Sequence, residues 1–136
     1  MRIGFDLHGI LTDFPHVFRP LLKGLVEAGI KVYILSGPPE EQIKRELLEL
    51  GYLRGVHYEH ALSVINYLQD FQDVKTWQDE NGNWWADDTD WWNAKGNIAR
   101  SYRLDLVVDD SPQYGENMPP ATAFALIKNL KMLSKE

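Results

Sequence analysis

The sequence predicts an α/β fold with a mostly parallel central sheet, and three observations support this prediction. First, apolar runs at residues 3–5, 30–35 and 104–110 are suited to buried strands. Second, a helical pattern separates the first two runs, and strand, helix and strand at this spacing form a βαβ unit with parallel strands. Third, polar side chains end each run. Because the carboxyl ends of parallel strands share one edge of a sheet, these polar groups are expected to meet there.

The helices on either side of the second strand follow from apolar spacing and from proline and glycine. Pro15 and Pro20 mark a loop, and a helix that ends at Gly29 follows it. Its predicted buried stripe consists of Val17, Phe18, Leu21, Leu22, Leu25 and Val26. The next helix opens at residues 38–41 with two prolines and two acids, as the helix dipole favours, and ends at Gly51. Its predicted buried stripe consists of Ile43, Leu47, Leu48 and Leu50.

Residues 56–69 suit either a strand or a helix. Residues 64–67 read Val-Ile-Asn-Tyr, which has the composition of a strand. The spacing of Ala61, Leu62, Ile65 and Leu68 also fits a helix. Since the α/β alternation requires a strand in this part of the chain, we predict one at 64–67.

A small β-hairpin is predicted as an insertion at about residues 70–92. Residues 74–77 and 84–86 flank an Asn-Gly turn, which is a strong hairpin pattern. All five tryptophans fall between residues 77 and 92. They suit a lid over a binding site, packing within the domain, or contact with a second copy of the chain in a homo-oligomer. These alternatives stay open.

The remaining segments complete a single domain over residues 1–136. A short helix is predicted at 93–100, before the strand at 104–110, and an edge strand at 121–127. No repeat or linker divides the chain.

Composition excludes several classes of protein. The net charge of −6 makes nucleic acid an unlikely partner. The absence of cysteine excludes disulfides and thiolate metal sites. No apolar run approaches the roughly 18 residues of a membrane span, and Met1 and Arg2 lead directly into a strand rather than a signal peptide. We therefore expect a cytoplasmic protein with no membrane partner.

The polar strand ends predict a Mg²⁺ site. Asp6, Ser36 and the pair Asp109 and Asp110 follow three predicted strands, and Lys95 lies shortly before the last of them. Clustered carboxylates repel one another unless a cation offsets them, and oxygen ligands favour Mg²⁺. A metal held by Asp6 and one of the later pair leaves positions open for the oxygens of a small phosphorylated substrate.

The same residue types can support phosphoryl transfer. Asp6 is a candidate nucleophile that would form an aspartyl-phosphate. Ser36 and the backbone N–H of Gly37 are candidates for binding the phosphoryl oxygens. Lys95 is placed to neutralise charge on the nucleophile and on the transferring group.

Four segments, taken in order, resemble the motifs of the haloacid dehalogenase (HAD) superfamily. They are residues 6–12, the strand ending at Ser36, Lys95, and the strand ending at residues 109–110, so the resemblance spans nearly the whole chain. It implies a Rossmann-like three-layer fold and a Mg²⁺-dependent phosphatase (hydrolase) activity. The short spacing between the motifs leaves no room for a large cap, which is typical of a capless or minimally capped member.

The resemblance also implies roles for individual residues. Asp6 would be the nucleophile, Ser36 the phosphate binder and Lys95 the lysine of the third motif. Asp109 and Asp110 would complete a metal site with Asp6. The backbone carbonyl of His8 would be a further metal ligand. Residues 9–13 are similar to capless sugar-phosphate phosphatases and residues 108–112 to deoxyribonucleotidases, which implies a sugar phosphate or a nucleotide as substrate.

His8 departs from the pattern of the superfamily. Its phosphatases usually carry a second aspartate there, two residues after the nucleophile, as general acid and base. The reference pKa of imidazole, roughly 6.5, suits the same proton transfers near neutral pH. A cationic imidazole beside Mg²⁺ is disfavoured by like charge. Two functions therefore stay open: an active phosphohydrolase that uses His8, or a weakened or inactive HAD-like binding protein that uses the Trp-rich hairpin.

Each candidate residue also has a purely structural interpretation. Asp6 suits a cap at a strand end, and Ser36 suits a helix N-cap because Pro38 and acids follow it. Lys95 suits a solvated helix surface. His57 and His60 have the spacing of a zinc pair, but no other residue supports that site, and a surface segment is the preferred interpretation.

Overall fold

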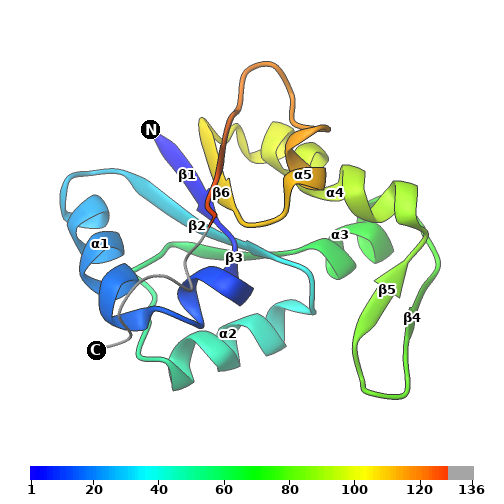
Figure 1. The fold of residues 1–136 in the computed structure, drawn as a ribbon, viewed down its shortest axis with the longest axis horizontal. Helices are drawn as coiled ribbons and strands as arrows, with labels where there is room; N and C mark the ends of the chain where they lie inside the picture. Colours follow the sequence, from blue (N-terminus) through cyan, green and yellow to red (C-terminus); the bar gives the residue numbers. More distant parts are fainter. Residues whose placement is uncertain (129–136) are drawn as a thin grey trace.

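A five-stranded parallel sheet forms the centre of the protein, as described by a computed structural model for residues 1–128 (Figure 1). All four strand pairings within the sheet are parallel, and the strand order is β3-β2-β1-β6-β7. The predicted α/β class with a mostly parallel central sheet is therefore confirmed. In chain order the elements are β1 (Arg2–Phe5), η1 (Leu7–Leu11), α1 (Pro15–Glu27), β2 (Lys31–Ser36), α2 (Glu40–Glu49), β3 (His60–Ser63), α3 (Val64–Phe71), β4 (Thr76–Gln78), β5 (Trp84–Ala86), α4 (Asp88–Tyr102), β6 (Leu106–Asp109), α5 (Pro112–Gly115) and β7 (Ala123–Leu126).

The strand order reverses at β1. The chain passes from β1 outward to β2 and β3, and then returns to the other side of β1 with β6 and β7. Phe5 pairs with Ile34 on one side and with Val108 on the other, so the ends of the three central strands are aligned. Ligands of open α/β sheets bind outside the carboxyl ends of the strands at such a reversal point. In this chain the point lies between β1 and β6.

Helices cover both faces of the sheet (Figure 1). One face packs against α1 and α2 through a cluster that includes Ile3, Phe5, Phe18, Leu22, Val32, Ile34, Ile43 and Leu47. The other face packs against α3 and α4 through a cluster that includes Tyr33, Leu35, Leu68, Ala94, Ile98 and Val107. Because full burial of one such aliphatic or aromatic side chain contributes about 1.5–3 kcal/mol, the two clusters hold the strand ends in fixed positions.

The strand predicted at residues 64–67 is wrong, because this segment forms the start of α3. The third strand is instead His60–Ser63, which pairs in parallel with β2. Ser63 begins the helix as its N-cap, and its hydroxyl accepts a hydrogen bond of 3.0 Å from the backbone N–H of Asn66. The N-cap and the helical spacing of the apolar residues thus outweigh the β-branched composition.

Two further predictions about helices need correction. Pro20 lies inside α1 rather than in a loop before it. Val17 and Leu21 are 38% and 45% exposed, and Leu48 of α2 is 65% exposed, so the buried stripes are narrower than predicted. Each helix covers the sheet from one side only, and its apolar residues outside the contact face remain in solvent.

The tryptophan-rich region divides between two elements. β4 and β5 pair antiparallel and project away from the central sheet at the right of Figure 1. Trp91 and Trp92 lie on α4, which begins at Asp88 rather than at residue 93 because the side chain of Asp87 caps it by accepting a hydrogen bond from the backbone N–H of Thr89. The edge strand predicted at 121–127 is confirmed as β7.

Within residues 1–128, no helix has both the length and the apolar character that crossing a membrane would require.

Candidate functional site

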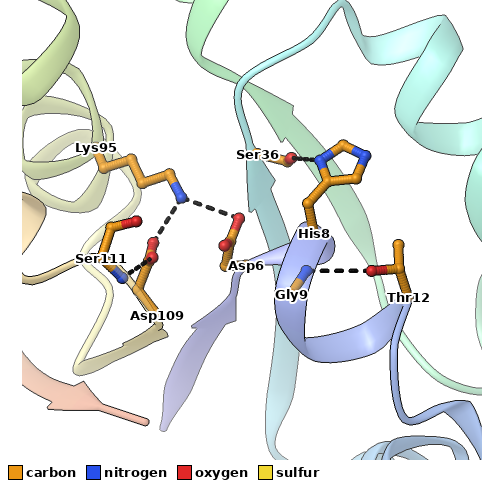
Figure 2. Close-up of polar contacts among 8 residues, drawn as sticks. All are labelled: Asp6, His8, Gly9, Thr12, Ser36, Lys95, Asp109 and Ser111. Atoms are coloured by element: carbon orange, nitrogen blue, oxygen red, sulfur yellow. Dashed lines mark hydrogen bonds and ion pairs between the residues drawn. The ribbon is translucent and has the colours of Figure 1, made fainter. Parts of the chain in front are cut away.

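The structure brings the predicted polar strand ends together at the reversal point of the sheet. Asp6 follows β1 directly, Ser36 is the last residue of β2 and Asp109 is the last residue of β6. The backbone N–H of Asp6 donates to the carbonyl of Val108 at 2.9 Å, which continues the pairing of β1 and β6 up to the two aspartates. Asp6 lies between Asp109 on one side and Ser36 on the other (Figure 2).

Lys95 reaches this strand edge from α4. Its amino group donates to Asp6 Oδ1 at 3.1 Å and to Asp109 Oδ2 at 2.6 Å (Figure 2). The lysine side chain is 2% exposed, and its amino group lies 4.2 Å from the centre of the Tyr114 ring. The interpretation of Lys95 as a solvated surface residue is therefore wrong. A buried ammonium requires such partners, because burial without them is strongly unfavourable.

One lysine does not offset the negative charge of this cluster. Burial raises the pKa of Asp6 to about 7; Lys95 opposes this rise, while Asp109 and Asp110 add to it. Burial lowers the pKa of Lys95, but the carboxylates of Asp6 and Asp109 outweigh that effect and raise it above its usual value. The lysine therefore stays charged, and Asp6 is the carboxylate whose ionised form is disfavoured by burial and by its acidic neighbours.

Asp110 completes a group of three carboxylates. If Asp6, Asp109 and Asp110 each offer one oxygen, the three atoms lie within 4.8 Å of one another. Asp109 is fully buried and its second oxygen accepts a hydrogen bond of 3.0 Å from the backbone N–H of Ser111, whereas Asp110 is exposed at the rim. An oxygen set of this kind suits Mg²⁺.

Gly9 is required by the position of Asp110. Its backbone has φ +81°, which side chains other than glycine rarely adopt, and a Cβ at this position would overlap the Asp110 carboxylate. Glycine thus lets the turn after β1 pass directly beside the third carboxylate.

His8 lies on the other side of Asp6, between Ser36 and an acid that the sequence did not indicate. His8 Nδ1 is 3.4 Å from Ser36 Oγ, and His8 Nε2 is 3.1 Å from Glu46 Oε2 on α2. A carboxylate can only accept, so Nε2 carries a proton and donates it to Glu46. The ring is half exposed, so it is fixed by these partners rather than by burial.

A cavity of about 610 Å³ opens over these groups. It is bounded by Asp6, Asp110 and Lys95, by His8 and Glu46, and by the aromatic side chains of Trp84, Trp85, Trp91 and Tyr114. Glu46 and Tyr114 were not predicted as site residues. Glu46 is 38 residues from His8 in sequence and is one of several acids on α2, so no local pattern distinguishes it.

The remaining structural interpretations can also be decided. Ser36 is not an N-cap, since α2 begins after Pro39 and has no side-chain cap. His57 is buried, so its interpretation as a surface residue is wrong. Its Nδ1 accepts a hydrogen bond of 2.9 Å from the backbone N–H of Leu53, which uses one of its possible metal-binding atoms. Among residues 1–128, the carboxylate cluster is the one group of three or more potential metal ligands, and it includes neither His57 nor His60.

Comparison with known proteins found no family model and no curated protein that matches this chain.

Proposed function

We propose that this protein is a Mg²⁺-dependent phosphohydrolase of the HAD type, which acts on a small phosphorylated metabolite through an aspartyl-phosphate on Asp6. The observation that carries the proposal is the carboxylate cluster at the reversal point of the sheet, with Lys95 bonded to two of its three members. The order and spacing of Asp6, Ser36, Lys95 and Asp109 resemble the HAD motifs. A capless HAD-like domain is the corresponding proposal for the fold.

The residues of the cluster fit Mg²⁺. Asp6, Asp109 and Asp110 offer three carboxylate oxygens close enough for one ion, and the backbone carbonyl of His8 is the further ligand that the resemblance implies. A bound cation would offset the negative charge that raises the pKa of Asp6. The ion would supply charge neutralisation for phosphoryl oxygens.

The side chains divide the reaction between them. The Asp6 carboxylate attacks phosphorus, so that an O–P bond forms to Asp6 while the bond from phosphorus to the leaving oxygen breaks. His8 is assigned as the proton donor to that oxygen, and afterwards as the base for the water that hydrolyses the aspartyl-phosphate. Ser36 and the N–H of Gly37 bind phosphoryl oxygens, and Lys95 offsets their charge.

Phosphate release from a panel of phosphorylated metabolites tests this proposal. We expect Mg²⁺-dependent release for at least one member, abolished in Asp6→Asn and retained in Asp70→Asn, which changes an exposed aspartate on α3. Mg²⁺ with beryllium fluoride, a mimic of phosphoryl bound to aspartate, should raise the melting temperature more than either additive alone. Absence of both effects in folded wild-type protein would refute the phosphoryl site.

The alternative function is a catalytically weakened or inactive HAD-like protein that binds a partner, or a second copy of itself, through the hairpin. The exposure of Trp77 and Trp85, 45% and 44%, favours it, because large exposed aromatic side chains are frequent at interfaces. This alternative predicts that Trp77→Ala or Trp85→Ala abolishes association measured by sedimentation, while Asp6→Asn has no effect on it. A monomer at all accessible concentrations would exclude the self-association form.

A further inference from the structure

We propose that the substrate is a nucleoside monophosphate whose base stacks on Trp85 and Trp91. This inference rests on the proposed function, because it assumes that the phosphoryl group sits at Asp6. It goes further by selecting a nucleotide over a sugar phosphate. It also assigns the hairpin, which the catalytic proposal does not use, as the wall that recognises the base.

The first step is that the proposed catalytic residues Asp6 and Lys95 line the same cavity as the hairpin. The hairpin lines it with segment 82–85, and Trp91 lines it as well. Its volume, about 610 Å³, falls within the range of about 300–1,000 Å³ that is typical of sites for whole small molecules. The cavity therefore has room for a large group attached to the phosphate.

The second step is that the aromatic wall is fixed before a ligand arrives. The Trp85 indole N–H donates to Asp79 Oδ2 at 2.9 Å, and Asp79 also accepts from the backbone N–H groups of Asn81 and Asn83. The rings of Trp85 and Trp91 are 6.0 Å apart at an interplanar angle of 39°. Trp85 is nonetheless 44% exposed, so a pre-oriented ring is available for stacking.

The third step is that this wall adjoins the phosphate site. A Cβ at Gly37 would lie 3.0 Å from the Trp91 ring, so this ring is in close contact with the backbone that we assign to phosphoryl binding. A molecule with its phosphate at Gly37 therefore extends along Trp91 toward Trp85. A base stacks on aromatic side chains through its π-face, whereas a bare sugar has no π-face.

The fourth step is that the charges of the cavity favour a single phosphate. Among its lining residues, Lys95 is the one lysine or arginine, and its amino group already bonds two carboxylates. Glu46 and Asp110 also line the cavity and would repel additional phosphates. Uncharged amides are present at Gln42 and Asn83, and these groups suit hydrogen bonds to a base edge.

Calorimetric binding with the full chain and Mg²⁺ tests the inference independently of turnover. The probes are phosphonate analogues, with carbon in place of the ester oxygen, of adenosine 5′-monophosphate, uridine 5′-monophosphate and ribose 5-phosphate. Since stacking of one base contributes about 5- to 150-fold in affinity, we expect the nucleotide analogues to bind at least about fivefold more tightly than the ribose analogue. A 5′-phosphorylated tetranucleotide should bind more weakly than the mononucleotides, because of its additional phosphates.

Variants of the two equally exposed hairpin tryptophans locate the contact. Trp85→Ala should remove much of the preference for the nucleotide analogues and leave binding of the ribose analogue unaffected, and Trp85→Phe should retain most of the preference. Trp77→Ala is the matched control, because Trp77 has the same exposure but does not line the cavity. Equal binding of nucleotide and ribose analogues, or equal losses in Trp85→Ala and Trp77→Ala, would overturn the inference.

Phosphate release without base preference would leave the proposed function intact, and base-dependent binding without any phosphate release would refute that function instead.

Discussion

Replacing Asp6 by asparagine is expected to stabilise the metal-free protein. The substitution keeps the shape of the side chain. It removes the negative charge of Asp6, the carboxylate whose ionised form the cluster disfavours. Burial is the main reason that the pKa of Asp6 rises to about 7, and repulsion by Asp109 and Asp110 adds to it. The ionised carboxylate is therefore unfavourable in the folded state, even though Lys95 donates a hydrogen bond to it.

The magnitude follows from the linkage between pKa and stability. A rise from the ordinary value of 3.8 to about 7 corresponds to about 4 kcal/mol of lost folding free energy above pH 7, at about 1.36 kcal/mol for each pH unit. Below pH 3.8 the carboxyl is protonated in both the folded and unfolded states, and the loss vanishes. Between these limits the loss grows as the pH rises. The advantage of Asp6→Asn should therefore be near its maximum at pH 8 and largely absent at pH 4.

Urea unfolding in EDTA at pH 4, 6 and 8 measures this difference. We expect Asp6→Asn to exceed the wild type by about 2–4 kcal/mol at pH 8, the lower figure allowing for the lost charge-assisted hydrogen bond to Lys95. Asp70→Asn, at an exposed position, should match the wild type within about 0.5 kcal/mol. A lower stability for Asp6→Asn than for the wild type at pH 8 would show that the ion pair with Lys95 outweighs burial and repulsion, and would refute the reasoning.

Three further predictions concern helix glycines, the ion pairs of Lys95 and the buried His57. Gly96→Ala in α4 should destabilise the protein by about 1–3 kcal/mol, because the new Cβ would overlap the backbone carbonyl of Asn117, whereas Gly24→Ala in α1, with open space around it, should stabilise it by up to about 1 kcal/mol. Lys95→Met should cost about 3–5 kcal/mol at pH 8, since it leaves two buried carboxylates without their cation. Burial holds the pKa of His57 below its usual range, so stability should fall as the pH drops through about 6.5, and His57→Asn should reduce that fall between pH 7 and 5.

Comparing the urea midpoints of the variants with that of the wild type tests these three predictions. Stabilisation by Gly96→Ala would show that the loop at Asn117 yields to the new methyl group. No loss in Lys95→Met at pH 8 would show that the carboxylates are solvated enough to do without the ammonium. An unchanged pH dependence in His57→Asn would exclude this histidine as its source.

The positions of the strand-end residues could be predicted from the sequence because parallel strands constrain them. Once the runs before Asp6, Ser36 and Asp109 are assigned as parallel strands, the sheet itself places their carboxyl ends at one edge. Lys95 required one more assumption, that a helix precedes the last strand. That helix is longer than predicted, but the lysine is still directed at the cluster.

Contacts between elements distant in sequence could not be predicted in this way. The bond between His8 and Glu46 depends on how α2 crosses the sheet, and its apolar periodicity specifies only which face is buried. The third strand was predicted at residues 64–67 rather than at His60–Ser63, because the local composition of residues 64–67 favours a strand. The decisive interaction was a single N-cap at Ser63.

Under the proposed function, the repulsion within the metal-free cluster would favour binding of a cation. Three ionised carboxylates and one ammonium sum to a charge of −2, which one divalent ion neutralises. Binding of the ion to the native state alone would raise the stability of the fold. Asp6→Asn relieves the repulsion without an ion, so it should gain metal-free stability and lose Mg²⁺ affinity together. In a purely structural salt bridge the same substitution would lower stability, and the sign of that change distinguishes the two cases.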